Sequence, residues 1–409
     1  MRFSLGINYW PRRSAMAMWK DFDPSEIAED FAHIAALGFD TVRFFLRWFD
    51  FQPHPQRMDR TMLGRLEHVM ELIGANGLRA MPTLFCGHMS GVNWLPEWTL
   101  DHSTASGRFR TLTEAGEMPY GSADFYTGWL LDAQRYHVRE VGRVLRGHPA
   151  VFAWDLGNEF TNVRDPASVA DAREWSKRLS HELERASGHR VTAGLHGEDL
   201  TRERNIRPSW ISEPWAFATM HGYSVYSEFA RGRTDAGVVP FLAQLTAAFT
   251  RKPVLFSEFG NPTCPPGKRS PYERVPLPDE APPPAIAADD PLRAAYACLS
   301  ETEMAQYARA VLERLHADGR LGAYWWCWAD YAEGLRNRPP FDRAPHEMSF
   351  GIIRRDGSEK RGAEALTAFA REARTVVAPH DPEIFEPAYY ADLPRTTHEA
   401  YAHFLELRA

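Results

Sequence analysis

Residues 154–159 read WDLGNE, an apolar, strand-like start that ends in an asparagine and a glutamate. Residues 253–260 read PVLFSEFG and follow the same plan, because an apolar run ends there in Glu258. In a parallel β-barrel, side chains at the carboxyl ends of the strands point into one common mouth. The two segments therefore predict two strands whose terminal glutamates, Glu159 and Glu258, face each other.

Short apolar runs alternate with helix-period segments on both sides of these two stretches. The predicted strands lie at 3–9, 41–45, 78–84, 150–155, 190–195, 215–220, 253–257 and 321–326. Helical spacing of apolar residues predicts two helices before residue 77 and further helices near 125–146, 167–186, 235–250, 302–318 and 362–376. Eight strands with intervening helices favour an α/β fold of the (β/α)8 TIM-barrel type over an open doubly wound sheet. No glycine-rich dinucleotide fingerprint follows the first strand, which also counts against a Rossmann fold.

The first helix has recognisable start and stop signals. Asp23 is a suitable N-cap, Pro24 suits the first helical position, and Glu26 stands where a capping box has its acidic residue. Gly38 follows the last residue of the apolar periodicity and predicts the end of the helix.

Two long segments, about 87–124 and about 261–300, follow the third and seventh predicted strands. Loops of this length on the active-site face of a barrel are usually functional walls or lids. We expect one catalytic barrel over residues 1–376 and a C-terminal tail over 377–409 that packs on the barrel exterior. The chain has no internal repeat and no sign of a second domain.

The composition excludes several classes of protein. The 409 residues include 47 basic and 54 acidic side chains, a formal charge of −7, which counts against a nucleic-acid partner. No apolar run reaches the roughly 20 residues of a membrane span. The N-terminus begins at once with a strand pattern instead of a signal peptide, so we expect a cytoplasmic protein without membrane contact. No feature defines an oligomeric state.

The four cysteines, Cys86, Cys264, Cys298 and Cys327, are scattered along the chain without metal-ligand spacing. In a cytoplasmic protein, this pattern predicts four free thiols. Since no P-loop, EF-hand or zinc-protease motif is present either, we expect neither a metal nor a cofactor.

A pair of carboxylates at opposed strand ends suits the hydrolysis of a glycoside. One carboxylic acid protonates the leaving oxygen, and the other carboxylate attacks the anomeric carbon if the two groups lie roughly 5–5.5 Å apart. Their environments must separate their pKa values so that one is protonated while the other is ionised. The sequence predicts this pairing for Glu159 and Glu258.

The two motifs resemble those of clan A glycoside hydrolases, and most of all those of glycoside hydrolase family 5, the cellulase and mannanase family. The resemblance covers roughly residues 3–375. It implies a retaining mechanism in which Asn158-Glu159 on the fourth strand supplies the acid/base and Glu258 on the seventh strand is the nucleophile.

Further positions match the family pattern and are implied to bind substrate or to support the carboxylates. Arg43 in VRFF matches the second-strand arginine that bonds the nucleophile, and His88 in CGH matches the third-strand histidine. His221 and Tyr223 match the His-x-Tyr of the sixth strand. In the cluster YWWCW at 324–328, Trp326 is favoured over Trp325 and Trp328 as the sugar platform. Trp10, Trp94 and Trp98 are additional candidates for lining subsites.

The resemblance implies a β-linked oligosaccharide substrate but leaves the glycone open between mannose, glucose and galactose, and the linkage open as well. A cytoplasmic enzyme meets short oligosaccharides, so we expect an exo-acting β-mannosidase or β-glucosidase. The alternative within the family is an endo-β-1,4-mannanase or glucanase. Alternatives from other classes are a non-catalytic sugar-binding barrel and a barrel lyase or isomerase that uses metal-bound carboxylates.

Overall fold

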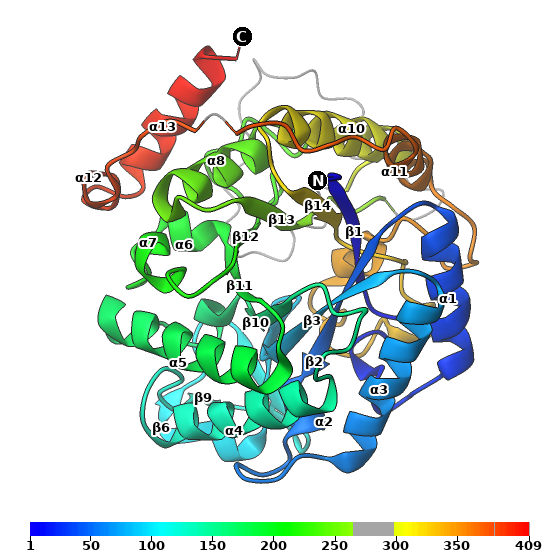
Figure 1. The fold of residues 1–409 in the computed structure, drawn as a ribbon, viewed down its shortest axis with the longest axis vertical. Helices are drawn as coiled ribbons and strands as arrows, with labels where there is room; N and C mark the ends of the chain where they lie inside the picture. Colours follow the sequence, from blue (N-terminus) through cyan, green and yellow to red (C-terminus); the bar gives the residue numbers. More distant parts are fainter. Residues whose placement is uncertain (265–297, 380, 409) are drawn as a thin grey trace.

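The computed structural model describes residues 1–264, 298–379 and 381–408, and its central feature is a closed parallel barrel (Figure 1). The barrel order is β1-β14-β13-β12-β11-β10-β3-β2. The strands are β1 (Ser4–Tyr9), β2 (Thr41–Arg47), β3 (Arg79–Cys86), β10 (Trp154–Asn158), β11 (Val191–His196), β12 (Ala218–His221), β13 (Val254–Phe259) and β14 (Gly322–Trp325). The predicted (β/α)8 fold is confirmed.

Helices surround the barrel on the outside (Figure 1). The longer ones that follow strands are α1 (Pro24–Ala36), α3 (Arg60–Ala75), α4 (Gly128–Val144), α5 (Val169–Ser187), α8 (Val238–Thr250), α10 (Glu301–Ala317) and α11 (Arg361–Arg371). Between β11 and β12 the helices are short, α6 (Gly197–Thr201) and α7 (Pro208–Ile211). Asp23 caps α1 as predicted, by accepting hydrogen bonds from the amides of Ser25 and Glu26. The carboxylate of Glu26, however, accepts from the amide of Arg13, so it is engaged outside the predicted capping box.

The buried apolar residues form two clusters. A large cluster lies between the strands and the helices, and a smaller one, formed by Met81, Ala153, Phe217, Leu255 and Tyr324, lies inside the barrel. Inward-facing side chains of parallel strands alternate with outward-facing ones, so both clusters are built from the same strands. Buried polar residues of the same strands, such as Asp155 and Glu258, lie nearer the carboxyl-terminal mouth of the barrel.

Register shifts occur at the carboxyl ends of several barrel strands. They fall between Phe45 and Arg47 on β2, between Asp155 and Asn158 on β10, and between Phe256 and Phe259 on β13. A bulge re-aims the side chain that follows it, and bulges are frequent beside active sites. The fourth strand begins at Trp154 and ends at Asn158, later than the predicted 150–155, because residues before Trp154 form a turn with an isolated bridge from Val151 to Ala80.

The predicted loop at about 87–124 is a folded insertion. It contains the short strands β4 (His88–Met89), β5 (Val92–Trp94), β6 (Leu100–Ala105), β7 (Arg110–Thr113), β8 (Gly116–Met118) and β9 (Tyr120–Ser122). These strands form one four-stranded sheet and one two-stranded sheet. The second predicted loop, about 261–300, lies outside the described residues for 265–297.

The C-terminal tail carries α12 (Glu386–Tyr390) and α13 (Arg395–Glu406), which lie beside α7 and α8 on the outside of the barrel (Figure 1). Tyr401 packs on Phe241 of α8 and donates a hydrogen bond to Asp235, and Tyr390 donates one to the carbonyl of Asp199. No helix among the described residues has the length and apolar character needed to cross a membrane.

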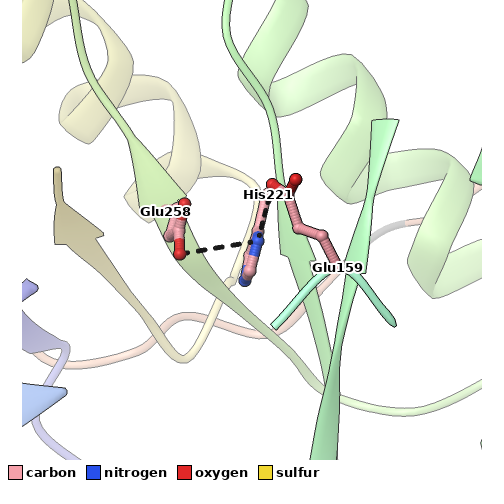
Figure 2. A group of neighbouring side chains, drawn as sticks. All are labelled: Glu159, His221 and Glu258. Carbon is pink, nitrogen blue, oxygen red and sulfur yellow. Dashed lines mark hydrogen bonds and ion pairs between the residues drawn. The ribbon is translucent and has the colours of Figure 1, made fainter. Parts of the chain in front are cut away.

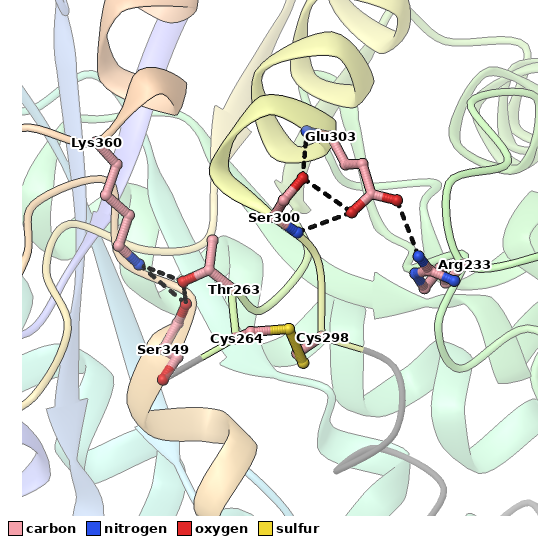
Figure 3. The surroundings of a disulfide bond; sticks show 8 residues. All are labelled: Arg233, Thr263, Cys264, Cys298, Ser300, Glu303, Ser349 and Lys360. Carbon is pink, nitrogen blue, oxygen red and sulfur yellow. Dashed lines mark hydrogen bonds and ion pairs between the residues drawn. A yellow bond between two sulfur atoms is a disulfide. The ribbon is translucent and has the colours of Figure 1, made fainter. Parts of the chain in front are cut away.

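The expectation of four free thiols is wrong, because Cys264 and Cys298 form a disulfide (Figure 3). Their chain segments also share backbone hydrogen bonds: the amide of Cys264 donates to Leu299, and the amide of Leu299 donates to Pro262. Cys86 and Cys327 are free and buried. Spacing alone did not reveal the pair, since the two cysteines are 34 residues apart. Disulfides are typical of oxidising compartments, so the cytoplasmic location stays a prediction.

We expect thiol titration of the unfolded chain to find two free thiols without reductant and four after reduction, because only Cys86 and Cys327 are unpaired. A Cys264→Ser/Cys298→Ser double variant should show two thiols under both conditions. Its free energy of unfolding should be lower by about 3 kcal/mol, since the crosslink limits the entropy of the unfolded chain. Four thiols without reductant would contradict the disulfide.

Candidate active site

A cavity of about 930 Å³ opens at the carboxyl ends of the barrel strands. Its wall is formed by the loops that follow β3, β10, β11, β12 and β14, by the tip of the insertion, and by the tail residues Leu393, Pro394, Thr397 and His398. The tail therefore borders the site as well as packing on the barrel exterior. Most of the residues predicted from the sequence line this cavity: His88, Asn158, Glu159, His221, Tyr223, Glu258 and Trp326.

Glu159, directly after β10, and Glu258, on β13, lie on either side of His221 at the end of β12 (Figure 2). Nδ1 of His221 is 3.2 Å from Oε1 of Glu159 and 3.6 Å from Oε1 of Glu258. An oxygen of each carboxylate and a nitrogen of His221 all lie within 4.8 Å of one another. The two glutamates predicted from separate motifs thus form one pair.

The backbone of Glu159 is in the left-handed region, with φ 46° and ψ 47°. A residue with a Cβ adopts this conformation at a cost of about 1–3 kcal/mol, and such residues cluster at functional sites. The turn points the carboxylate into the cavity, where Nδ2 of Asn162 donates a hydrogen bond of 3.0 Å to Oε2. The Glu159 side chain is 16% exposed, more than the 4% of Glu258.

Glu258 is held by one charged and one neutral donor. Nη1 of Arg43 donates to Oε1 at 2.5 Å, and the Tyr223 hydroxyl donates to Oε2 at 2.7 Å. Burial, with the Glu258 charge next in importance, holds the pKa of Tyr223 well above its usual range, so this phenol remains a donor. Both oxygens of Glu258 are therefore fixed by hydrogen bonds.

Arg43 is fully buried and lies beneath the cavity instead of lining it. Besides Glu258, it donates to Asp155 through Nε at 3.0 Å and Nη2 at 2.7 Å, to Asn8 at 2.9 Å and to Asn158 at 2.9 Å. Burial acts to lower the pKa of Arg43, but the charges of Asp155 and Glu258 outweigh it and raise that pKa. Arg43 is therefore a positioning residue. It was predicted among the substrate-binding residues, but in this structure it acts on the site through Glu258.

The two site histidines are neutral at physiological pH. Burial lowers the pKa of His221 to about 3, although the charge of Glu258 opposes the shift. Burial likewise lowers the pKa of His88 to about 4, against the opposing charge of Glu159. Nε2 of His88 is 3.9 Å from Glu159, and its Nδ1 is 2.8 Å from Oδ1 of Asn93. Neither imidazole brings a permanent positive charge to the carboxylate pair.

The three clustered tryptophans at the end of β14 all belong to the large apolar cluster, but of the three only Trp326 also lines the cavity. Trp326 contacts Phe45 edge-to-face, with ring centroids 5.8 Å apart. The additional candidates do not line the cavity. Trp10 stacks on Phe45, Trp94 is buried, and Trp98 donates a hydrogen bond to the carbonyl of Gln52.

Sequence reasoning missed several residues of the site. Asp155 and Asn8 are buried polar residues in barrel strands, and that pattern could have marked them as partners of Arg43. Ser90, Tyr226 and Glu347 lie in loops, where no strand-end pattern points to them. Tyr226 donates to Glu347 at 2.9 Å, and Ser90 donates to Glu347 at 3.0 Å.

Glu159, His221 and Glu258 also bring three side chains of metal-ligating types within 4.8 Å of one another. The guanidinium of Arg43 already places a positive charge 2.5 Å from Glu258. A divalent cation at Glu258 would meet that charge at close range, where Coulomb repulsion is strong. The arrangement suits acid–base and nucleophilic chemistry better than metal binding.

We expect Arg43→Met to lower the free energy of unfolding by about 3–5 kcal/mol, because it leaves Asp155 and Glu258 as buried charges without their partner. Arg43→Lys should cost less, since the charge is kept and only the forked geometry is lost. The control is Arg178→Met, which removes a half-exposed ion pair with Glu174 and should change stability little. Urea unfolding measures all three; equal effects at the two sites would contradict this role of Arg43.

No family model and no curated protein sequence matches the chain. Solved structures do match it. An exo-β-1,4-mannosidase from an Opitutaceae bacterium is 25% identical with a TM-score of 0.71; the match covers 91% of this chain and 60% of that enzyme, so this chain spans less than two thirds of its length.

Two enzymes of glycoside hydrolase family 5, subfamily 18, are similar in fold. One from Streptomyces cattleya, in complex with Manβ1-4GlcNAc, is 20% identical with a TM-score of 0.78, over 99% of this chain and 91% of that chain. One from Bifidobacterium longum subsp. longum, in complex with the same disaccharide, is 19% identical with a TM-score of 0.73, over 92% and 80%. The resemblance read from the strand-end motifs is thus confirmed in structure: the chain has the clan A (β/α)8 fold of these family 5 glycoside hydrolases.

Proposed function

We propose that this protein is a retaining β-glycoside hydrolase that removes single sugars, foremost β-mannose, from the non-reducing end of short oligosaccharides. The observation that carries the proposal is the pair Glu159 and Glu258, with carboxylate oxygens within 4.8 Å of each other. Retaining enzymes have their two carboxyl groups about 5–5.5 Å apart, whereas inverting enzymes need about 6.5–9.5 Å to admit a water.

In this mechanism Glu258 is the nucleophile and Glu159 is the acid/base. Arg43 and Tyr223 each donate a hydrogen bond to one oxygen of Glu258 and orient the carboxylate, so that an oxygen can attack the anomeric carbon. Glu159 protonates the departing oxygen as the bond to the aglycone breaks, which yields a covalent glycosyl-enzyme. Glu159 then removes a proton from the incoming water, which releases the sugar with its original anomeric configuration.

The neighbourhood of Glu159 fits a group that changes its protonation. Its carboxylate faces a neutral His221 at 3.2 Å and an amide donor from Asn162 at 3.0 Å, without an arginine or lysine partner among the described residues. Glu258 instead has Arg43 at 2.5 Å. The two environments differ in the direction that an acid and a nucleophile require.

Exo action is supported by contacts that close one side of the barrel mouth. In the barrel order, β3 and β14 are separated by β2 and β1. Loops after β3 and β14 are nevertheless joined, through Ser90 to Glu347 at 3.0 Å, Arg110 to Asp342 at 2.8 Å, and Arg343 to Glu117 at 3.2 Å. Among the described residues, none from the loops after β1 and β2 lines the cavity. A chain that extends past the catalytic pair on that side meets this wall.

Mannose is favoured as the glycone because the structural neighbours include an exo-β-1,4-mannosidase and family 5 enzymes bound to Manβ1-4GlcNAc. A β-glucosidase is the alternative that the same cavity would accommodate, and an endo-acting mannanase or glucanase would need the wall to be open. A non-catalytic sugar-binding barrel would not need the fixed geometry of Glu258 or the strained backbone of Glu159. A panel of aryl β-glycosides and short oligosaccharides tests the activity and the glycone.

We expect Glu258→Ala and Glu159→Ala to be rescued by azide with opposite product configurations on an activated aryl β-mannoside. Without the nucleophile, azide attacks the face that Glu258 leaves open and gives an α-glycosyl azide. Without the acid/base, azide attacks the glycosyl-enzyme and gives a β-glycosyl azide. Proton NMR of the products distinguishes the two. A swap of the configurations would reverse the roles, and full activity in either variant would remove that residue from the mechanism.

We expect mannotetraose to release mannose from the first time points, and soluble mannan to keep its viscosity, because the wall between the loops after β3 and β14 admits only a chain end. Product chromatography and viscometry provide the measurements, with Glu258→Ala as the blank. Rapid viscosity loss with mid-sized early products would show an open, endo-acting cleft.

A further inference from the structure

Glu347 is a carboxylate in the cavity wall that the mechanism above does not use. It lies in a short 3-10 helix, η5 (Pro345–Ser349), in the loop after β14, and it is 7% exposed. Its oxygens accept hydrogen bonds from the hydroxyl of Tyr226, in the loop after β12, and from the hydroxyl of Ser90, in the loop after β3. We call these three hydrogen-bonded side chains, Ser90, Tyr226 and Glu347, the back wall.

Burial alone would raise the pKa of this carboxyl group, but hydrogen bonds offset that effect. Burial acts to raise the pKa of Glu347, and hydrogen bonds from His346, Tyr226 and Ser90 outweigh it, so that the pKa is lowered. Nε2 of His346 lies 3.5 Å from Oε1 of Glu347. Its partners among the described residues are thus an imidazole and two hydroxyls, in place of the arginine that a structural buried carboxylate commonly has.

Glu347 also has acceptor capacity left. An ionised carboxylate offers about four lone-pair positions; the hydroxyls of Tyr226 and Ser90 occupy two of them, and Nε2 of His346 lies 3.5 Å from Oε1. Glu347 lines the cavity, so its remaining acceptor positions can be reached from there. Two oxygens of one carboxylate can accept from two neighbouring hydroxyl groups, which is the arrangement that a vicinal diol of a sugar presents.

The back wall is tied to the nucleophile. Tyr226 packs on Tyr223 with ring centroids 5.5 Å apart, and the hydroxyl of Tyr223 donates to Glu258 at 2.7 Å. Glu347 is therefore separated from the nucleophile by two tyrosines, on the side of the cavity that is closed toward β1 and β2. Glu347, Trp326 and Glu258 all line the same cavity.

We propose that Glu347 is a specificity-determining residue that accepts hydrogen bonds from the 3- and 4-hydroxyl groups of the terminal sugar. The inference rests on the proposed function, and it deepens that function in two ways. It requires a free 4-hydroxyl, which makes the enzyme exo-acting, because a sugar linked at O4 would displace the diol from Glu347. It also selects equatorial 3- and 4-hydroxyls, which mannose and glucose share, against the axial 4-hydroxyl of galactose.

The test measures kcat/KM of the wild type and of Glu347→Gln on an aryl β-mannoside and on its 3-deoxy, 4-deoxy and 6-deoxy analogues. In the wild type, loss of the 3- or 4-hydroxyl should lower kcat/KM by about 10- to 100-fold, as expected for a hydrogen bond to a charged group. Glu347→Gln should lower kcat/KM on the parent aryl β-mannoside by a similar factor. In this variant, removal of the 3- or 4-hydroxyl should lower kcat/KM by less than about threefold more. The 6-deoxy analogue should lower kcat/KM by the same factor in both proteins.

The matched control is Glu333→Gln, the same change in the same long loop, at an exposed residue that pairs with Arg336 and does not line the cavity. It should behave as the wild type with every analogue. Equal factors for parent and 4-deoxy substrates in wild type and Glu347→Gln would overturn the inference while the proposed function stands. If Glu347→Gln does not fold, the wild-type panel decides alone, and indifference to the 3- and 4-hydroxyls overturns it. Absence of turnover of any aryl β-glycoside by the wild type is the separate outcome that removes the proposed function.

Discussion

The buried guanidinium of Arg43 is the interaction on which the site depends. Arg43 lies on β2 and joins it to three other barrel strands. Its partners are Asn8 on β1, Asp155 and Asn158 on β10, and Glu258 on β13. Two carboxylates on one buried cation are tolerable only where the geometry is good and every donor is used. The barrel satisfies this condition, since strands that are far apart in the sequence bring their carboxyl ends together. The same contact that stabilises the barrel mouth therefore fixes one oxygen of Glu258 for chemistry, and stability and function at this position cannot be separated.

The remaining groups divide the work between the two carboxylates. Glu258 is held at both oxygens and sits low in the cavity, whereas Glu159 projects from a strained turn and contacts only neutral partners at hydrogen-bond distance. Burial keeps His221 uncharged between them, so the imidazole separates the pair without supplying a cation that would ionise both groups. The strain at Glu159 fits a general rule: unfavourable backbone geometry persists where it places a reacting group.

The sequence was informative where a pattern is local and failed where a contact is made between loops. Apolar runs that end in polar residues predicted all eight barrel strands, and the residues at their ends, among them Glu159, Glu258 and His221, do meet in one cavity. The fourth strand was placed too early because the apolar residues just before Trp154 form only an isolated bridge, from Val151 to Ala80. Ser90, Tyr226 and Glu347 were missed because each is an ordinary polar residue in its own loop, and only the closed barrel brings the loops after β3, β12 and β14 together. The disulfide between Cys264 and Cys298 was missed because the two cysteines are 34 residues apart and their spacing follows no motif.

The order of strands around the barrel explains why substrate range is decided by such loops. The carboxylate pair is set by β10 and β13. Here the loops after β3 and β14 meet above β1 and β2, and the ion pairs of Arg110 with Asp342 and of Arg343 with Glu117 reinforce that contact. Closing this side turns a groove into a pocket, and the back wall then faces the far edge of the bound sugar. The opposite side is bordered by the loops after β11 and β12 and by the tail residues Thr397 and His398. In the proposed function, the barrel core thus provides the carboxylate pair, while the insertion and the long loop after β14 would determine which end of a sugar chain reaches it.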